Sequence, residues 1–325
     1  MTAALELAEA VRSRDRRALA KAITLVESTR SEERDLAEEL LSAIGAPAVR
    51  SFRVGVTGVP GAGKSTLIDA LGCHALAAGS RVAVLAVDPS SRQTGGSVLG
   101  DKTRMTRLSA EPGAFIRPSP TLGVLGGTAG RTPEVILLCE AAGYDLVFVE
   151  TVGVGQSEER VANMVDCVLL VQLSGAGDEV SSMKRGVLEA ADLIAFNKAD
   201  GDRAPAANAD AASLRASLGI SRGGRVPAVL VLSALTDVGV EQLLAALTTY
   251  GAATREDGSF ELRRSAQRRA WFDSALEEEL RELFTRRPAF ALARAAAADS
   301  VAKGAVSASA AARRLLAELL PAVRS

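Results

Sequence analysis

Residues 58–66 combine glycines with a lysine and two hydroxyl side chains, a set suited to binding phosphate. The stretch "GVPGAGKST" matches the pattern G-x-x-x-x-G-K-[ST] between the apolar run "FRVGVT" and a helical stretch. Glycines let backbone N–H groups turn inward around an anion, and the start of the helix adds partial positive charge. We therefore expect phosphate binding by Gly58, Val59, Pro60, Gly61, Ala62, Gly63, Lys64, Ser65 and Thr66.

Two of these side chains have a more specific expected role. We expect Lys64 to bridge the β- and γ-phosphates of a nucleotide. The Ser65 hydroxyl is a hard oxygen donor and is expected to bind Mg²⁺. A phosphate-binding loop alone does not say which nucleotide is bound.

The base is predicted by "FNKAD", where Asn197, Lys198 and Asp200 form N-K-x-D directly after a predicted strand. A carboxylate at Asp200 can accept hydrogen bonds from N1–H and the 2-amino group of guanine, and adenine offers no such pair of donors. Unpaired polar groups in a partly buried site are costly, so this pattern favours GTP over ATP. After the last predicted strand, the backbone of Ser233, Ala234 and Leu235 is expected to lie against guanine O6.

Acidic residues lie at the ends of two further predicted strands. "YDLVFVETVG" places Glu150 and Gly153 where GTPases usually carry D-x-x-G, so Glu150 is expected to reach Mg²⁺ through a water and the Gly153 amide to contact the γ-phosphate. Asp88 ends an earlier strand, and Asp101 lies thirteen residues further on in a loop rich in Ser, Thr and Gly. Such a loop is suited to a metal-dependent switch, although a solvated loop with unrelated acids is the alternative.

The elements that must position these residues alternate between short apolar strands and helices. The expected strands are "FRVGVTG", "RVAVLAVD", "GAFIRPS", "YDLVFVET", "DCVLLVQL", "DLIAFNKAD" and "PAVLVLSAL". Near-continuous apolar strands separated by helices predict an α/β fold with a doubly wound, mainly parallel sheet covered on both faces. We predict an N-terminal helical segment over 1–50, a P-loop NTPase domain over 51–250 and a C-terminal helical region over 251–325.

Charge, cysteine spacing and apolar runs indicate which compartment and which classes of partner to expect. With 38 basic and 39 acidic residues, no net field points to nucleic acid or to a membrane surface. The three cysteines are widely spaced, which favours buried free thiols over a disulfide framework or a CxxC metal site. No targeting pattern and no apolar run of membrane-spanning length is present, so we expect a cytoplasmic protein.

A wider set of motifs resembles one family. "GVPGAGKST", "DPSS..TGGS.LGDKTRM", "VETVGVGQSE", "GAGDEVSSMKRG" and "NKAD" are similar to the MeaB/ArgK family of P-loop GTPases, and the resemblance covers nearly the whole chain. It implies a Mg²⁺-dependent GTP-hydrolysing chaperone of adenosylcobalamin-dependent methylmalonyl-CoA mutase, or of a related acyl-CoA mutase. Such a chaperone would gate cofactor loading and protect or reactivate the mutase.

The resemblance also implies roles for single residues. Asp88, Asp101 and Glu150 match the family's acids around Mg²⁺, and "GAGDEVSSMKRG" matches a third switch that couples the nucleotide state to the mutase. Arg104 and Lys184 are our candidates for stabilising charge in the transition state; solvated or partner-facing bases are the alternative. The resemblance implies a dimerisation arm in the C-terminal region, and packing of the 260–284 helix on its own domain is the alternative.

Two other functions share parts of this pattern. A metal-delivery GTPase of the hydrogenase or urease maturation type requires a transferable metal site, and the sequence has no CxxC, Cys-Pro-Cys or His-rich tract. An amino-acid-transport kinase requires an acceptor pocket and a base near the γ-phosphate, and no residue pattern marks either. The mutase chaperone is the function that these motifs favour.

Overall fold

The structure is a computed structural model. It describes residues 2–28, 30–47, 50–87, 105–119, 131–151, 161–174, 188, 190–221, 226–285 and 288–319. Two compact units are present, Met1–Arg268 and Arg269–Ser325. The first unit contains the sheet and the candidate site.

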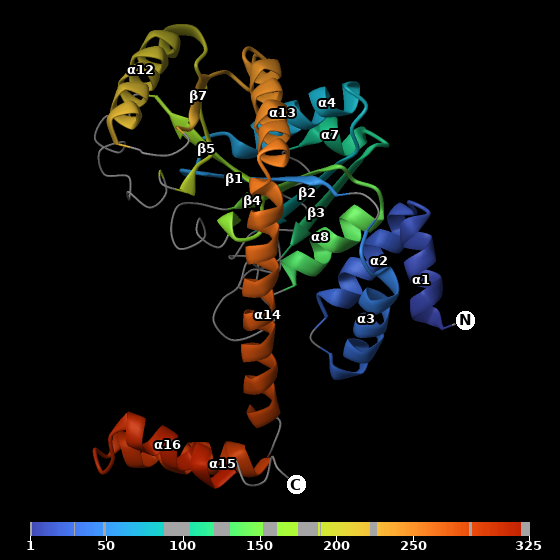
Figure 1. Cartoon of the computed structure of the whole chain (residues 1–325), viewed down its shortest axis with the longest axis vertical. Helices are drawn as coiled ribbons and strands as arrows, with labels where there is room; N and C mark the ends of the chain where they lie inside the picture. The colour runs from blue at the N-terminus through green and yellow to red at the C-terminus, as the bar shows by residue number, and fades with distance from the viewer. Residues whose placement is uncertain are drawn as a thin grey trace. The chain divides into compact units, whose positions relative to one another are not determined.

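A seven-stranded sheet forms the centre of the first unit (Figure 1). Its order is β3-β2-β4-β1-β5-β6-β7, and every neighbouring pair is parallel. The predicted α/β fold with a doubly wound, mainly parallel sheet is therefore confirmed, and each of the seven expected runs contains one strand. The strands are β1 (Phe52–Gly58), β2 (Val82–Val87), β3 (Ala114–Ser119), β4 (Leu146–Thr151), β5 (Cys167–Leu173), β6 (Leu193–Asn197) and β7 (Ala228–Val231).

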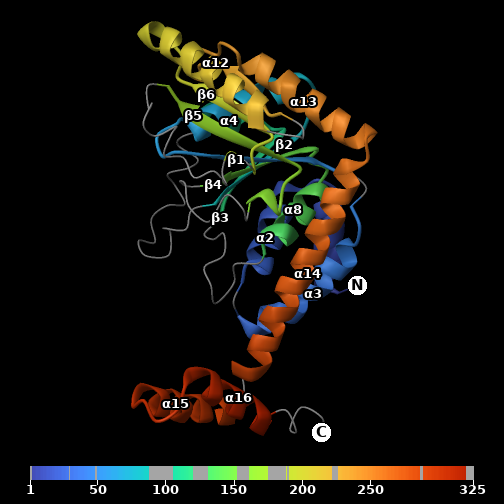
Figure 2. The same cartoon turned by 60° about the vertical axis from the view of Figure 1, so that its left-hand side comes forward.

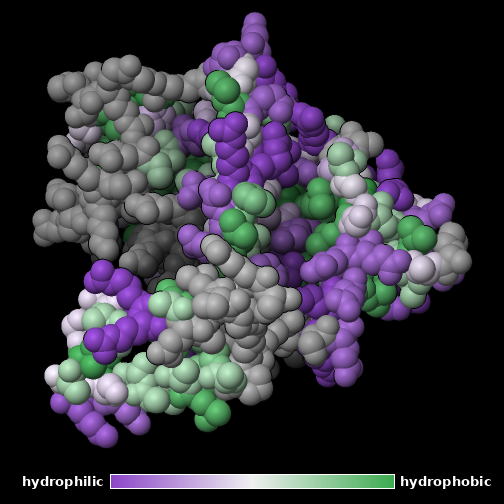
Figure 3. Space-filling model, turned by 60° about the horizontal axis from the view of Figure 1, so that its bottom comes forward, coloured by the Kyte–Doolittle hydropathy of each residue, from purple (hydrophilic) through white to green (hydrophobic). Residues whose placement is uncertain are grey.

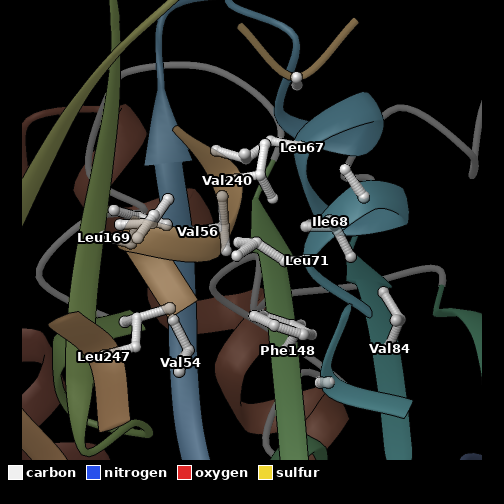
Figure 4. Close-up of a cluster of buried hydrophobic side chains, with 14 of the residues drawn as sticks. Val54, Val56, Leu67, Ile68, Leu71, Val84, Phe148, Leu169, Val240 and Leu247 are labelled. Carbon is white, nitrogen blue, oxygen red and sulfur yellow. The ribbon is translucent and has the colours of Figure 1, made fainter. Parts of the chain in front are cut away.

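Helices cover both faces of this sheet (Figure 2). On one face α4 (Lys64–Ala77), α7 (Thr106–Ala110) and α13 (Val240–Glu256) pack over the central strands. Figure 4 shows this contact, in which Leu67, Ile68 and Leu71 of α4 lie beside strand residues such as Val56 and Phe148. On the other face lie α8 (Thr132–Ala141) and α12 (Ala204–Ser221). Strands buried on both faces account for their continuous apolar sequences.

Three N-terminal helices extend the core that α8 forms with the sheet. They are α1 (Ala3–Arg12), α2 (Arg16–Val26) and α3 (Ser31–Ile44), as expected for this segment. The side chains of Thr2 and Asp15 cap α1 and α2 by accepting backbone N–H bonds. The apolar sides of α1 and α2 bury Val11, Leu19 and Ile23 completely.

A buried charge network attaches the start of α14 (Ser259–Thr285) to the ends of the strands opposite the phosphate loop. Arg264 is 4% exposed, and its guanidinium donates to Asp166 Oδ1 and Oδ2 at 2.8 and 2.7 Å and to Glu140 Oε1 at 3.1 Å. Glu140 also accepts two bonds from Arg53, each 3.0 Å long. Each charge in this network has an opposite partner, which the cost of burying ions requires.

We predict that Arg264→Ala lowers the free energy of unfolding by about 3–5 kcal/mol, because Asp166 and Glu140 lose a buried cation. Urea unfolding followed by circular dichroism measures this loss. The matched control is Arg268→Ala on the same helix, since Arg268 is exposed, and it is expected to change stability by less than about 0.5 kcal/mol. Equal losses in the two variants would contradict this account of the network.

The second unit is helical and contains the later part of α14 with α15 (Pro288–Ala302) and α16 (Ala308–Leu319). Its α14 residues include three exposed apolar side chains at spacings of four, Phe272, Leu276 and Leu280. Figure 3 views the molecule from below and shows hydrophobic and hydrophilic residues interspersed on the face in view. The helices of the described ranges include none with the length and apolar character needed to cross a bilayer.

All three cysteines are free. Cys139 and Cys167 are buried, and burial raises the pKa of both thiols. Cys73 is only partly buried. Burial raises the pKa of the Cys73 thiol as well, so what distinguishes Cys73 is its partial exposure. We predict that Cys73 reacts first with a thiol reagent such as DTNB, and that Cys139 and Cys167 react only after the protein unfolds. A native protein that releases three equivalents at one rate would contradict this prediction.

Candidate functional site

The phosphate loop joins the end of β1 to the start of α4 at the carboxyl edge of the sheet. Gly58 has φ +139°, and a Cβ placed there would lie 2.0 Å from the Val171 carbonyl oxygen. Gly63 has φ +85°, and its Cβ would lie 2.6 Å from Asn197 Nδ2. The chain therefore requires glycine at both ends of the loop, because a side chain would collide with β5 or with the end of β6.

Lys64 is the first residue of α4 and is 8% exposed. Its Nζ donates to the carbonyl oxygens of Gly58 at 2.9 Å and Val59 at 3.1 Å, so the side chain folds back along the loop. Burial lowers the pKa of the Lys64 ammonium, and the nearby Glu150 carboxylate opposes that shift. The ammonium is thus a poorly hydrated cation at the positive end of a helix, where an anion is strongly favoured.

Glu150 lies on β4 directly beside β1, in register with Val56. The Ser65 hydroxyl donates to Glu150 Oε1 at 2.7 Å. This contact joins two oxygen-bearing side chains, separated by 85 residues in the sequence, next to Lys64. A hydroxyl and a carboxylate at the start of the helix fit the oxygen ligands that Mg²⁺ prefers.

Asn197 connects the phosphate loop with the loop that follows β7. Its side chain is buried, with Nδ2 donating to the Ala62 carbonyl oxygen at 2.8 Å and Oδ1 accepting from the Ala234 N–H at 3.0 Å. A second contact joins the segment after β6 to the loop after β7, since the Ser233 hydroxyl donates to Asp200 Oδ1 at 2.9 Å. The N-K-x-D and Ser-Ala-Leu segments are therefore adjacent in space and are held together by their own side chains.

These segments enclose a pocket of about 270 Å³. Residues from three segments of the chain line it: Gly63, Thr66, Asn197, Lys198, Asp200, Arg203, Ala234 and Leu235. Sequence reasoning did not identify Arg203, which ends the short 3-10 helix η2 (Gly201–Arg203). Its position three residues after Asp200, one turn of that helix away, is the signal that could have suggested it.

Other predicted site residues have different positions. Val59, Pro60 and Gly61 form the first part of the phosphate loop, between β1 and α4. Five predicted residues lie outside the described residues, namely Asp88, Asp101, Arg104, Gly153 and Lys184. Their proposed roles around a metal or a γ-phosphate stay predictions.

Comparison with known proteins identifies the family. The model of the family "Methylmalonyl Co-A mutase-associated GTPase MeaB" matches residues 19–289. GTPase ArgK of Escherichia coli is 46% identical over 280 residues, covering 84% of this chain and 85% of that protein. The mitochondrial methylmalonic aciduria type A homolog of Mus musculus is 42% identical over 288 residues, covering 84% of this chain and 69% of that protein.

A solved structure extends the similarity to the whole fold. The crystal structure of an LAO/AO transport system kinase superposes with a TM-score of 0.75 at 35% identity, covering 98% of this chain and 97% of that one. The phosphate loop, the Ser65–Glu150 pair and the pocket beside Asp200 thus lie in a chain whose relatives are named GTPases. The chain belongs to the MeaB family of methylmalonyl-CoA mutase-associated GTPases.

Proposed function

We propose that GTP binds across the phosphate loop, with its phosphates at Gly58–Thr66 and its guanine in the pocket beside Asp200. One observation carries this proposal: Asn197 joins the phosphate loop to the Ser233–Leu235 segment by two hydrogen bonds. A nucleotide spanning the two loops would meet Lys64 at one end and the Asp200 carboxylate at the other. Lys198 lines the same pocket, and its alkyl chain is proposed to pack against the base.

The proposed metal is Mg²⁺, held by Ser65 and, through water, by Glu150, with Asp88 and Asp101 as further acids. The 2.7 Å contact between Ser65 and Glu150 supports this choice, because both groups are hard oxygen donors. Bound Mg²⁺ neutralises charge that develops on the phosphate oxygens. We predict that EDTA abolishes hydrolysis and that added Mg²⁺ restores it; hydrolysis that persists in excess EDTA would contradict the metal assignment.

The proposed reaction is hydrolysis of the γ-phosphoryl group. A water oxygen bonds to the γ-phosphorus while the bond to the β–γ bridging oxygen breaks, GDP leaves with the electron pair, and the water proton passes to the phosphate. Lys64 stabilises the charge on the β- and γ-phosphates, and the Gly153 amide contacts the γ-phosphate. Arg104 and Lys184 are the proposed additional cations of the transition state.

The proposed client is an adenosylcobalamin-dependent methylmalonyl-CoA mutase or a related acyl-CoA mutase. The name of the family supports this link, since it describes methylmalonyl-CoA mutase-associated GTPases. We propose that GTP hydrolysis gates adenosylcobalamin loading and that the complex protects or reactivates the mutase. The free thiols fit a reducing compartment, and we propose that the chain acts in the cytoplasm.

The decisive experiment measures GTP hydrolysis with and without the mutase from the same cell, together with adenosylcobalamin transfer to the apo-mutase. We expect the mutase to raise the hydrolysis rate and GTP to change the rate or extent of cofactor loading. A metabolic enzyme that does not use cobalamin serves as the control protein. If the mutase neither binds nor changes either rate, the chaperone function is wrong.

We propose that the chain works as a homodimer, with 1–50 as the helical segment, 51–250 as the GTPase domain and 251–325 as the dimerisation region. Phe272, Leu276 and Leu280 support this proposal because they form an exposed apolar row on α14. Light scattering on the full chain should give twice the monomer mass. Replacing the three residues by serine should give monomers, and an unchanged dimer would exclude this surface.

A further inference from the structure

Helix α4 carries an ionisable side chain ten residues after Lys64 that the proposed function does not use. His74, the one histidine of the chain, lies in the last turn of α4. Its Nε2 is 2.8 Å from Asp237 Oδ2. Asp237 belongs to the loop between β7 and α13, which also contains the pocket residues Ala234 and Leu235. The two ends of α4 therefore contact the phosphate loop and the loop beside the pocket.

We call residues 232–239 the pocket loop. Backbone hydrogen bonds fix the two ends of this loop. The Ser233 N–H donates to the Val238 carbonyl oxygen at 2.9 Å, and the Ala234 N–H donates to Asn197. Gly239, with φ +80°, is the N-cap residue of α13. These bonds position the point where the loop leaves the sheet and returns to it.

The tip of the pocket loop has fewer contacts. Leu235 is 79% exposed and Val238 is 65% exposed, so neither side chain anchors the turn in the core. Asp237 has φ +63°, a conformation that costs free energy for a residue with a side chain. The contact with His74 joins this residue to α4 at the protein surface, where the His74 and Asp237 side chains are 31% and 45% exposed.

A cation close to this pair, Arg107, forms its ion pair with Asp69 and not with Asp237. On α4, Asp69 accepts from Arg107 Nε of α7 at 2.9 Å and from the Leu108 N–H at 2.8 Å. Arg107 is thus engaged by Asp69, although it lies close enough to interact with Asp237 electrostatically. Glu111 and Cys73 complete the ionisable groups of this cluster.

We infer that His74 is a positioning residue for guanine recognition: it holds Asp237 and so fixes the pocket loop in the conformation that contacts the base. This inference rests on the proposed binding of guanine by Ala234 and Leu235. Helix α4 would then act at both ends of the nucleotide, because its first residue, Lys64, contacts the phosphates and His74 in its last turn positions the loop that contacts the guanine. Loss of the bond should weaken recognition of guanine and leave phosphate binding intact.

The test measures dissociation constants for GDP and ADP with the full chain by isothermal titration calorimetry. His74→Ala should weaken GDP binding by roughly three- to tenfold, as expected for one lost hydrogen bond, and should leave the ADP constant unchanged. The preference for GDP over ADP then falls by the same factor. His74→Gln keeps a side-chain donor and should restore the preference to within about twofold.

The matched control is Arg107→Ala, which removes a neighbouring ion pair of α4 and a charge interaction with Asp237, but no hydrogen bond to the pocket loop. It should keep the full preference for GDP. An unchanged preference in His74→Ala, or equal effects of His74→Ala and Arg107→Ala, would overturn the inference. Asp200→Asn distinguishes failure of the His74 inference from failure of the proposed guanine site. If Asp200→Asn abolishes the preference for GDP while His74→Ala does not, only the His74 inference fails. If Asp200→Asn has no effect on the preference, the proposed guanine site itself fails.

Discussion

Lys64→Ala is expected to lower the rate of GTP hydrolysis by about 10²–10³-fold, the effect of removing one preorganised group that stabilises transition-state charge. The Lys64 ammonium is buried and is already held at the phosphate loop by Gly58 and Val59. Little conformational entropy of the Lys64 side chain is therefore lost when the nucleotide binds. The attraction to phosphate is also strong, because the site excludes much of the water that would screen it.

Single-turnover hydrolysis with the isolated protein measures this effect, and GDP binding by calorimetry separates loss of affinity from loss of rate. Lys64→Met keeps most of the side-chain volume and tests whether the charge or the packing matters. Lys303→Ala is the control, because Lys303 is exposed at the end of a helix in the second unit. A folded Lys64→Met variant that hydrolyses GTP at the original rate would refute the role of Lys64.

Asp200→Asn is expected to reduce kcat/KM for GTP by at least roughly 10²-fold and to raise it for xanthosine triphosphate. The Asp200 carboxylate is proposed to accept hydrogen bonds from both guanine donors, whereas an amide offers one donor and one acceptor. Xanthine carries a carbonyl where guanine carries its 2-amino group, so the amide suits it better. Sites built on hydrogen bonds discriminate strongly, because a mismatched base leaves buried polar groups unpaired.

The fold should survive this substitution, since an asparagine Oδ1 can still accept the Ser233 hydroxyl that Asp200 Oδ1 accepts now. Asp202→Asn is the matched control: it removes the same charge two residues away, at an exposed position outside the pocket. Steady-state kinetics with both nucleotides measure the exchange of specificity. Equal losses for the two nucleotides in Asp200→Asn would show that the residue does not recognise the base.

The sequence predicted the local parts of this site well. The strand before Gly58, the glycines of the loop and the helix after Lys64 follow from residue spacing, because each depends on neighbours within a few positions. The same holds for the seven strands, whose apolar runs are short and bounded by turn residues. Belonging to the family also followed from motifs, each of which is a continuous stretch.

Contacts between distant residues were beyond the reach of such patterns. Arg264 lies 98 residues from Asp166, and nothing near either residue in sequence indicates that they share a buried ion pair. Arg203 escaped prediction for a related reason, since a charged residue in a short helix is usually solvated. Only the pocket formed by the neighbouring loops shows that Arg203 lines a ligand-sized space.

The amino-acid sequence by itself determined which backbone segments are predicted to bind phosphate and which residue types are predicted to select a base, because glycine spacing and side-chain hydrogen-bonding groups act locally. Tertiary structure alone decided that these segments form one site. The strand order brings β4 and β5 to the two sides of β1, with β6 next to β5, so Glu150 meets Ser65 and Asn197 meets Ala62 across 85 and 135 residues. These long-range contacts depend on the order of the parallel strands in the sheet, and local sequence patterns do not predict that order.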